Sequence, residues 1–373
     1  MNKIGTALAI GALAGGFGQT ALAEDFGGSQ RAVFVMTNDA DANEVVSYER
    51  TRYGTLQNSR RYATGGRGSG GTIDPLASQG SLTLSDDGTL LFAANAGSGN
   101  LSMFRVSGTR LDLRDRVPTG GSEPNAVAQH GRLVYVLNTA GSSSVVGFRV
   151  AGDHLVRISD SLRFLSGNFV NSASLAFTPD GRYLLATERA TNNIDVFRVL
   201  ADGTLSALTI NASVGPGAFS VVVAPNGTVI VAETGAGGPA SSAMSSYKIV
   251  ADGRLVPVTA SIPTLGAANC WNAVTPDGRF VYASNAGTDS IAGFRIGANG
   301  SLSPIGATLV GNNPAGSTNL DISISADGRF LYSLNAGSGA VGMFAIGRDG
   351  ALTSLGERQG LEGGAGLNGI ASN

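Results

Sequence analysis

The sequence is poor in residues on which several protein classes depend. Its one cysteine, Cys270, leaves no internal disulfide to support the fold, and we expect this thiol to be buried. Two lysines and two histidines occur in the whole chain, and 25 Lys and Arg face 27 Asp and Glu, which gives a net charge of −2. Nucleic-acid binding usually needs a basic surface, and the sequence has no basic run. We therefore expect no nucleic-acid partner.

Long hydrophobic runs are missing as well. The apolar stretch Ile4 to Phe17 follows Lys3, is too short for a comfortable membrane span, and precedes the small-residue sequence Ala21-Leu22-Ala23. This pattern predicts a signal peptide over residues 1–23 that is cleaved near Ala23. We expect one domain over residues 24–373, secreted or periplasmic, with no membrane span; the oligomeric state stays open.

Glycine, in contrast, is abundant. The chain has 55 glycines among 373 residues, yet 42% of its residues are apolar, and this apolar content argues against disorder. Many glycines follow Asp or Asn between apolar runs, as in Asp180-Gly181 and Asp277-Gly278. Such dipeptides are typical of hairpin turns, because these turns need positive φ. The glycines therefore predict many short strands.

A unit of about 50 residues repeats along the chain. The segment Gly278 to Gly287 recurs almost unchanged as Gly328 to Gly337. We name the residue that ends the first apolar run of each unit the register residue. The seven register residues are Asn38, Asn95, Asn138, Glu188, Glu233, Asn285 and Asn335. This spacing, with three or four short strands per unit, is typical of propeller blades. We predict an all-β, seven-bladed β-propeller of four-stranded antiparallel blades.

The two ends of the chain complement each other. The first unit lacks an initial strand, whereas residues 367–372 have the pattern of an initial strand with nothing after it. We predict that the C-terminal strand pairs into the N-terminal blade and closes the ring, which removes an open sheet edge.

The blade sequence resembles a known family. Pro-Asp-Gly-Arg before Tyr or Phe, then Tyr-x-x-Asn, then Phe-Arg-Val or Phe-Arg-Ile, is similar to the lactonase family of seven-bladed β-propellers over about residues 31–373. That family includes a 6-phosphogluconolactonase type and the fungal 3-carboxymuconate lactonizing enzymes, and it overlaps with the YVTN-repeat and WD40-like proteins. The resemblance implies a hydrolase or cycloisomerase that opens or forms a lactone ring.

Histidine chemistry is not expected here. Members of the family often carry His after Pro at the start of an inner strand, where this chain has Asn125 after Pro124. Its two histidines, His130 and His154, fall in turns on the face opposite the expected site. A catalytic base would therefore be a carboxylate.

The register residues offer such carboxylates. Glu188 and Glu233 replace Asn in neighbouring blades, and Arg189 follows Glu188. We predict these three as catalytic residues that bind an anionic substrate and move a proton. A residue repeated around a ring is also simply explained as structural, and that alternative stays open. The predicted substrate-binding residues at the channel mouth are Asn125, Phe219, Trp271, Asn272 and Asn319.

Two functions follow from these observations. The first is an exported enzyme that hydrolyses or forms the lactone ring of a small carboxylated or sugar-derived substrate. The alternative is an exported, non-catalytic propeller that binds a small molecule or a partner protein. No cofactor or metal is assigned, although a divalent cation such as Ca²⁺ on Glu188, Glu233 and nearby Asn oxygens is a further alternative. The longest loop, Gly65 to Gly80, carries Arg67 and Asp74 and could act as a flap.

Overall fold

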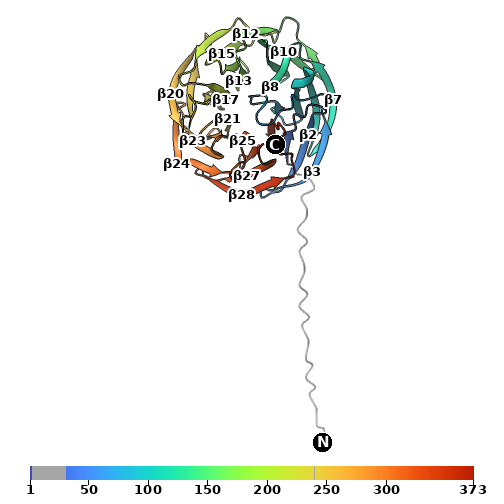
Figure 1. Cartoon of the computed structure of the whole chain (residues 1–373), viewed down its shortest axis with the longest axis vertical. Coiled ribbons are helices and arrows are strands. Elements are labelled where there is room, and N and C mark those ends of the chain that lie inside the picture. The colour runs from blue at the N-terminus through green and yellow to red at the C-terminus, as the bar shows by residue number, and fades with distance from the viewer. Residues whose placement is uncertain (2–30, 239) are drawn as a thin grey trace.

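The computed structural model describes Met1 and residues 31–238 and 240–373. Its strands form seven sheets that surround a central axis as blades (Figure 1). Apart from the 3-10 helix η1 (Ala96–Ser98), all regular structure in this part of the chain is β. No helix of the described residues is long and apolar enough to cross a bilayer. The predicted cleavage site near Ala23, and the predicted signal peptide apart from Met1, lie outside the described residues.

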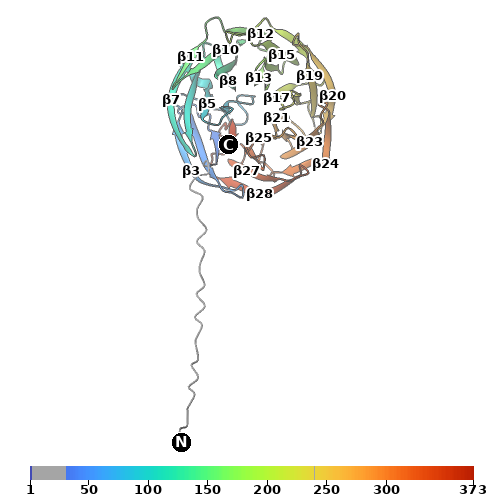
Figure 2. The ribbon, with the colours of Figure 1, turned by 180° about the vertical axis from the view of Figure 1, so that it is seen from behind.

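Within each blade the strands lie side by side, with the innermost strand at the centre of the ring and the outermost strand at its rim (Figures 1 and 2). Blade 1 consists of β29 (Ile370–Ser372), β1 (Ala32–Met36), β2 (Glu44–Arg50) and β3 (Leu56–Ala63). Blade 2 consists of β4 (Leu82–Leu84), β5 (Leu90–Asn95), β6 (Asn100–Ser107) and β7 (Arg110–Pro118). Blade 3 consists of β8 (Ser122–His130), β9 (Leu133–Ala140), β10 (Ser142–Ala151), β11 (His154–Arg157) and β12 (Arg163–Asn168).

The remaining four blades each have four strands. Blade 4 consists of β13 (Ser172–Phe177), β14 (Tyr183–Glu188), β15 (Asn193–Arg198) and β16 (Thr209–Ala212). Blade 5 consists of β17 (Ala218–Val223), β18 (Val229–Glu233), β19 (Ala243–Ile249) and β20 (Leu255–Pro263). Blade 6 consists of β21 (Asn269–Val274), β22 (Phe280–Asn285), β23 (Ser290–Ile296) and β24 (Leu302–Asn312). Blade 7 consists of β25 (Asn319–Ile324), β26 (Phe330–Asn335), β27 (Ala340–Ile346) and β28 (Leu352–Gln359).

The repeated Asp fixes the turn between the first two strands of a blade. In blade 4, the Asp180 carboxylate accepts hydrogen bonds from Thr178 Oγ1 (2.6 Å) and from the Arg182 N–H (3.1 Å), while Gly181 adopts φ +67°. The same arrangement recurs at Thr275, Asp277 and Arg279 and at Ser325, Asp327 and Arg329. These turns lie on one face of the ring, here named the turn face; the loops between second and third strands lie on the other, the loop face.

The hydrophobic core is a series of layers between blades. Strand β14 is buried along its whole length, whereas the rim strand β20 is largely half-buried or exposed. A layer between blades 2 and 3, for example, packs Phe92 against Val134 and Phe148. Apolar residues on both faces of the middle strands therefore stabilise the ring by joining each sheet to its neighbours.

The predicted ring closure is confirmed. Strand β29 pairs antiparallel with β1, with Ala371 opposite Phe34. Beside this pairing, the Ala32 N–H donates to Asn373 Oδ1 (2.7 Å), and the buried Arg50 donates to the Asn373 carbonyl oxygen (3.0 Å). The first blade therefore takes its inner strand from the end of the chain.

Blade 3 differs from the predicted four strands. Its outer strand is broken into β11 and β12, which both pair with β10. Between them Asp160 adopts φ +56°, and Ser161 Oγ contacts Gly147, donating to its carbonyl oxygen at 3.2 Å and accepting from its N–H at 3.1 Å. These bonds fold the chain back before the second half of the strand begins.

Closure of the ring predicts a large stability effect at β29. Deleting residues 365–373 should lower the melting temperature by about 10 °C, because buried Leu367 and Ile370 and the pairing with β1 are lost. The single change Ile370→Lys should act in the same direction. Ile210→Lys is the matched control, since Ile210 is exposed on the rim. Calorimetry that finds equal melting temperatures for the full and shortened chains would contradict the closure.

Candidate functional site

A segment of the longest loop fills the centre of the loop face. We name residues 72–79 the plug. The Ser78 carbonyl oxygen accepts a bond from Trp271 Nε1 (2.9 Å). The Gln79 side chain bonds both backbone groups of Asn272, donating from Nε2 at 2.7 Å and accepting at Oε1 at 3.1 Å. The Gln79 N–H donates to the Ala173 carbonyl oxygen (2.9 Å). The plug is thus fixed to blades 4 and 6.

Blade 3 and the segment that leads into blade 1 also bond the plug. Asn125 Nδ2 donates to the Leu76 carbonyl oxygen (3.4 Å), and Ser78 Oγ donates to the Asn125 carbonyl oxygen (2.7 Å). Asn368 Nδ2 donates to Asp74 Oδ1 (3.3 Å) just before β29 begins. Asp74 itself adopts φ +46°, in the left-handed region that Asp and Asn enter more readily than most residues. The loop predicted as a flap is therefore held closed by bonds to four blades.

The inner strands of blades 3 to 7 share an irregularity beside the plug. Near its start, each of these strands has a register shift against its neighbour. A bulge turns the following side chains in a new direction and is common beside functional sites. The residues within these shifts are Asn125, Ala173, Phe219, Ser220, Cys270, Leu320 and Asp321.

The carboxyl groups of Asp74 and Asp321 and the guanidinium of Arg189 lie near one another at the plug. Burial raises the pKa of Asp74 to about 8; nearby Arg189 opposes this rise and the Asp321 charge adds to it. Burial also raises the pKa of Asp321 to about 7. Arg189 is exposed, lies over the Phe219 ring at 6.0 Å, and forms no ion pair within the described residues. The mouth therefore holds a carboxyl group that titrates near neutrality beside an available cation.

A groove of about 540 Å³ leads outward from this point across the loop face. Arg189 and Cys270 line its inner end, and small residues of blades 5 and 6 line the rest. Cys270 is buried, as predicted, and burial raises the pKa of its thiol. The other lining residues are Thr234, Gly235, Ala236, Gly237, Gly238, Ser241, Ala267, Ala268, Gly287 and Thr288. These side chains are small, and Thr234, Ser241 and Thr288 among them carry hydroxyl groups that a ligand can contact.

The two predicted catalytic carboxylates lie between blades, away from the groove. Both Glu188 and Glu233 are fully buried. Glu188 accepts bonds from the backbone N–H of Ser166 (2.8 Å), from the Ser166 hydroxyl and from Thr191. Ser166 belongs to the outer strand of the preceding blade. The geometry favours the structural alternative for Glu188, which joins blade 4 to blade 3.

Glu233 has a similar structural role, because it bonds the connection between blades 4 and 5. Its Oε1 accepts from the Gly215 N–H (3.0 Å) and from Ser245 Oγ, and its Oε2 accepts from Ser261 Oγ (2.6 Å). Asn95 has the same role in blade 2, where its Oδ1 accepts from Asn43 Nδ2 (2.9 Å) of blade 1. At Asn95 and Glu188 the register residue is therefore a polar contact between consecutive blades, whereas the buried Asn138 amide of blade 3 has no hydrogen-bond partner among the described residues.

Glu188 has a second buried carboxyl group beside it. Burial raises the pKa of Asp195 to about 9, and its hydrogen bond to Glu188 and the charge of that carboxylate add to the effect. Burial also tends to raise the pKa of Glu188, but bonds from Asp195, Ser166 and Thr191 bring it below its usual value. Both carboxyl groups are fully buried.

The predicted binding residues separate into two groups. Asn125, Phe219, Trp271 and Asn272 lie around the plug, and the Phe219 and Trp271 rings pack edge to face at 5.4 Å. Asn319 lies instead between blades 6 and 7, where its Nδ2 donates to Ser284 Oγ (2.7 Å) and to the Ser290 carbonyl oxygen (3.1 Å).

Sequence reasoning did not assign Gln79 or Asp321 to the site. Asp321 is the single acid in the mainly apolar strand β25, which was the available signal for it. Gln79 gave no signal, because its partners are far away in the sequence.

The described part of the chain has no cluster of side chains suited to bind a metal ion. No three or more His, Cys, Asp or Glu side chains converge there in a way that could hold an ion. The oxygens of Glu188 and Glu233 already face N–H and O–H donors.

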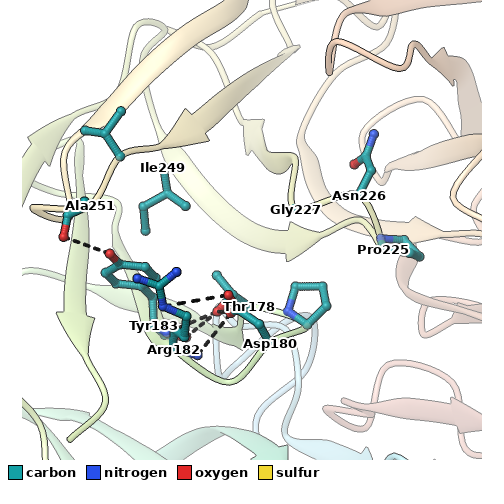
Figure 3. A pocket seen from close by; sticks show the side chains of 11 residues that line it. Thr178, Asp180, Arg182, Tyr183, Pro225, Asn226, Gly227, Ile249 and Ala251 are labelled. Atoms are coloured by element: carbon teal, nitrogen blue, oxygen red, sulfur yellow. Dashed lines mark hydrogen bonds and ion pairs between the residues drawn. The ribbon is translucent and has the colours of Figure 1, made fainter.

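A separate pocket of about 400 Å³ opens between blades 4 and 5 on the turn face (Figure 3). Tyr183 and Asp180 lie on one side of it and Asn226 on the other. Its polar groups are largely used within the turns, since Asp180 holds its own turn and the Tyr183 hydroxyl donates to the Ala251 carbonyl oxygen (2.9 Å). The pocket is therefore a by-product of the repeated turns and not a second candidate centre.

Known proteins share both the sequence pattern and the fold. A family profile described as a lactonase, 7-bladed beta-propeller, matches residues 25–154 and 271–365. An uncharacterized protein from Lactococcus lactis subsp. cremoris is 29% identical over 244 residues, covering 61% of this chain and 68% of its own.

Two solved structures show the fold. A Bacteroides uniformis protein provisionally described as a 6-phosphogluconolactonase has a TM-score of 0.70 at 19% identity, covering 93% of this chain and 100% of its own. The periplasmic gluconolactonase PpgL of Pseudomonas aeruginosa has a TM-score of 0.67 at 20% identity, covering 91% and 99%. At these identities the likeness concerns the fold alone.

The double change Glu188→Gln and Glu233→Gln tests whether these two carboxylates stabilise the fold. It should lower the melting temperature by about 5 °C, because each amide places an N–H₂ group among donors that need an acceptor. Glu362→Gln, at an exposed position, is the matched control and should leave the melting temperature unchanged. A double variant that melts with the wild type but loses catalytic turnover would support the catalytic interpretation of these residues instead.

Proposed function

Because this chain belongs to the lactonase family of seven-bladed β-propellers, we propose that it hydrolyses the lactone ring of a small sugar-derived substrate at the channel mouth. The observation that carries the proposal is that Asp74 lies in the plug near Arg189, which lines the inner end of the groove, close enough for the Arg189 charge to lower its pKa. A carboxyl group with a pKa of about 8 is suited to accept a proton near neutrality, and the guanidinium beside it is suited to bind an oxyanion.

The proposed reaction needs one base and one cation. Ionised Asp74 accepts a proton from a water molecule whose oxygen attacks the lactone carbonyl carbon. Arg189 stabilises the negative charge that develops on the carbonyl oxygen. The bond between that carbon and the ring oxygen then breaks, and the leaving oxygen takes the proton back from Asp74. The hydroxy acid that forms loses its proton to solvent, and its carboxylate is held by Arg189 until it leaves.

The charge of the groove indicates the substrate class. Arg189 is the one Lys, Arg or His among the described residues that line it. A phosphate dianion usually takes more than a single guanidinium, whereas one suffices for the carboxylate of a hydroxy acid. We therefore propose an unphosphorylated sugar lactone, whose hydroxyl groups would bond the hydroxyls of Thr234, Ser241 and Thr288 and the backbone of the small residues beside them.

Export is compatible with this proposal. The segment over residues 1–23 has the features of a signal peptide, and delivery to the periplasm or the medium would bring the domain to unphosphorylated sugars. PpgL, a protein of the same fold, is described as a periplasmic gluconolactonase, which supports this location by analogy.

Binding without turnover is the second candidate. Four blades bond the plug, and Asn368 already occupies one oxygen of Asp74. A site held this firmly suits a receptor for a small ligand or a partner protein. A ligand that binds at the groove and leaves unchanged would favour this function.

Replacing the proposed base tests the proposal directly. Asp74→Asn should lower kcat for a sugar lactone by at least about 100-fold, because the amide cannot accept the proton. Its melting temperature should stay close to that of the wild type, since Asn keeps the oxygen that Asn368 binds. Asp41→Asn, at an exposed position, is the matched control. The assay uses a panel of aldonic lactones with and without phosphate; a wild-type protein that hydrolyses none of them would rule the function out.

The pKa of Asp74 predicts the pH profile. Its carboxylate is the active form, so kcat/KM should rise as the pH increases through about 8 and level off above it. Arg189 lowers this pKa, and Arg189→Gln should therefore move the rising limb to higher pH as well as raise KM. A profile that is flat between pH 6 and pH 9, in steady-state assays of both proteins, would exclude Asp74 as the base.

A further inference from the structure

A channel of about 490 Å³ runs through the centre of the ring. The inner strands of all seven blades contribute to its wall, and the labels β8, β13, β17, β21 and β25 mark five of them around the centre in Figures 1 and 2. Gln79 and Gly80 bound it at the plug end, and Asp86 and Gln129 lie at its other end, on the turn face. The channel is thus reached from the face opposite the groove.

The wall mixes polar and apolar surface in similar amounts, and it carries a negative charge. Leu175, Val221 and Ile322 are among the residues that line its middle. None of the described residues that line it is Lys, Arg or His. Asp321 lies at the plug end, and Asp86 at the entrance lies 3.5 Å from His130. The inner carboxylate therefore has no cation of the chain beside it within the channel.

Asp321 has unused hydrogen-bonding capacity. It is 2% exposed and accepts bonds from the Ile322 N–H at Oδ1 (2.9 Å) and from the Ile370 N–H at Oδ2 (3.2 Å). The Gln79 side chain supplies a further bond. An ionised carboxylate offers about four acceptor positions, so about one remains. Burial without a counter-ion makes the charged form costly, in agreement with a pKa raised to about 7.

We propose that the channel is a second binding site, which takes a small organic ammonium ion whose apolar body lies along the wall and whose charged group pairs with Asp321. An ammonium supplies the missing positive charge and needs one carboxylate, whereas Ca²⁺ needs six to eight oxygen ligands. The volume falls within the range of small-molecule sites, and the apolar part of the wall would cover the body of the ligand.

This second site is separate from the groove of the proposed lactonase reaction, although the Asp321 charge contributes to the raised pKa of Asp74. The Gln79 and Asn272 bonds lie between the channel and the groove, so the two spaces open on opposite faces. Loss of hydrolysis would leave the channel proposal standing, and loss of channel binding would leave the reaction standing.

Calorimetric titration with three six-carbon probes tests the proposal. At pH 8 and moderate salt, n-hexylammonium should bind at least about tenfold more tightly than n-hexanol, and hexanoate should not bind measurably. Asp321→Asn, which keeps the shape of the side chain, should remove the difference between the ammonium and the alcohol. Asp86→Asn at the entrance is the matched control and should keep most of it.

A second variant covers the case in which Asp321→Asn does not fold. The Ser323 and Ser372 hydroxyls contact each other at 2.8 Å on the channel wall, and Ser323→Phe should block entry of hexylammonium without removing any charge. Equal affinity for the ammonium and the alcohol, or unchanged hexylammonium binding in the folded Asp321→Asn or Ser323→Phe proteins, would overturn the proposal. Displacement of hexylammonium by an equimolar amount of CaCl₂ would also overturn it, in favour of a metal site.

Discussion

The pairing of β29 with β1 is the contact on which the rest of the molecule depends. It joins the end of the chain to the first blade and gives that blade its inner strand, so that the ring is closed and each blade has a neighbour on both sides. The same stretch of chain also bonds the plug, since the Gly366 N–H donates to the Thr72 carbonyl oxygen (2.8 Å) and Asn368 donates to Asp74. The same C-terminal segment therefore closes the ring and positions the proposed base.

Much of the architecture could be predicted because its determinants are local and repeated. An Asp that bonds the N–H two residues later, followed by Gly at positive φ, specifies a turn within a few residues. Repetition of this turn in units of about 50 residues leaves few folds to consider. The broken outer strand of blade 3 could not be predicted in this way, because contacts between Ser161 and Gly147 determine it and no repeated motif marks them.

The candidate site was less predictable, for a physical reason. The bonds that hold the plug join residues 47 to 294 positions apart, as from Ser78 to Asn125 and from Asp74 to Asn368, and no periodic pattern encodes them. Glu188 and Glu233 stood out because they break the Asn pattern, yet their hydroxyl and N–H partners lie in strands and connections that no motif marks. Whether such a carboxylate acts as a catalytic base or as a structural contact between blades depends on its burial. Burial is determined by these partners and not by the residue type.

The single tryptophan gives the molecule an optical property of its own. Trp271 Nε1 is bonded to the plug through the Ser78 carbonyl oxygen, and the indole ring packs against Phe219 below Arg189. Indole emission responds to hydrogen bonding and to contact with water, and red-edge excitation separates it from the emission of the tyrosines. Any displacement of the plug therefore changes the colour and intensity of the light that the protein emits, and the state of the channel mouth can be followed in solution without an added dye.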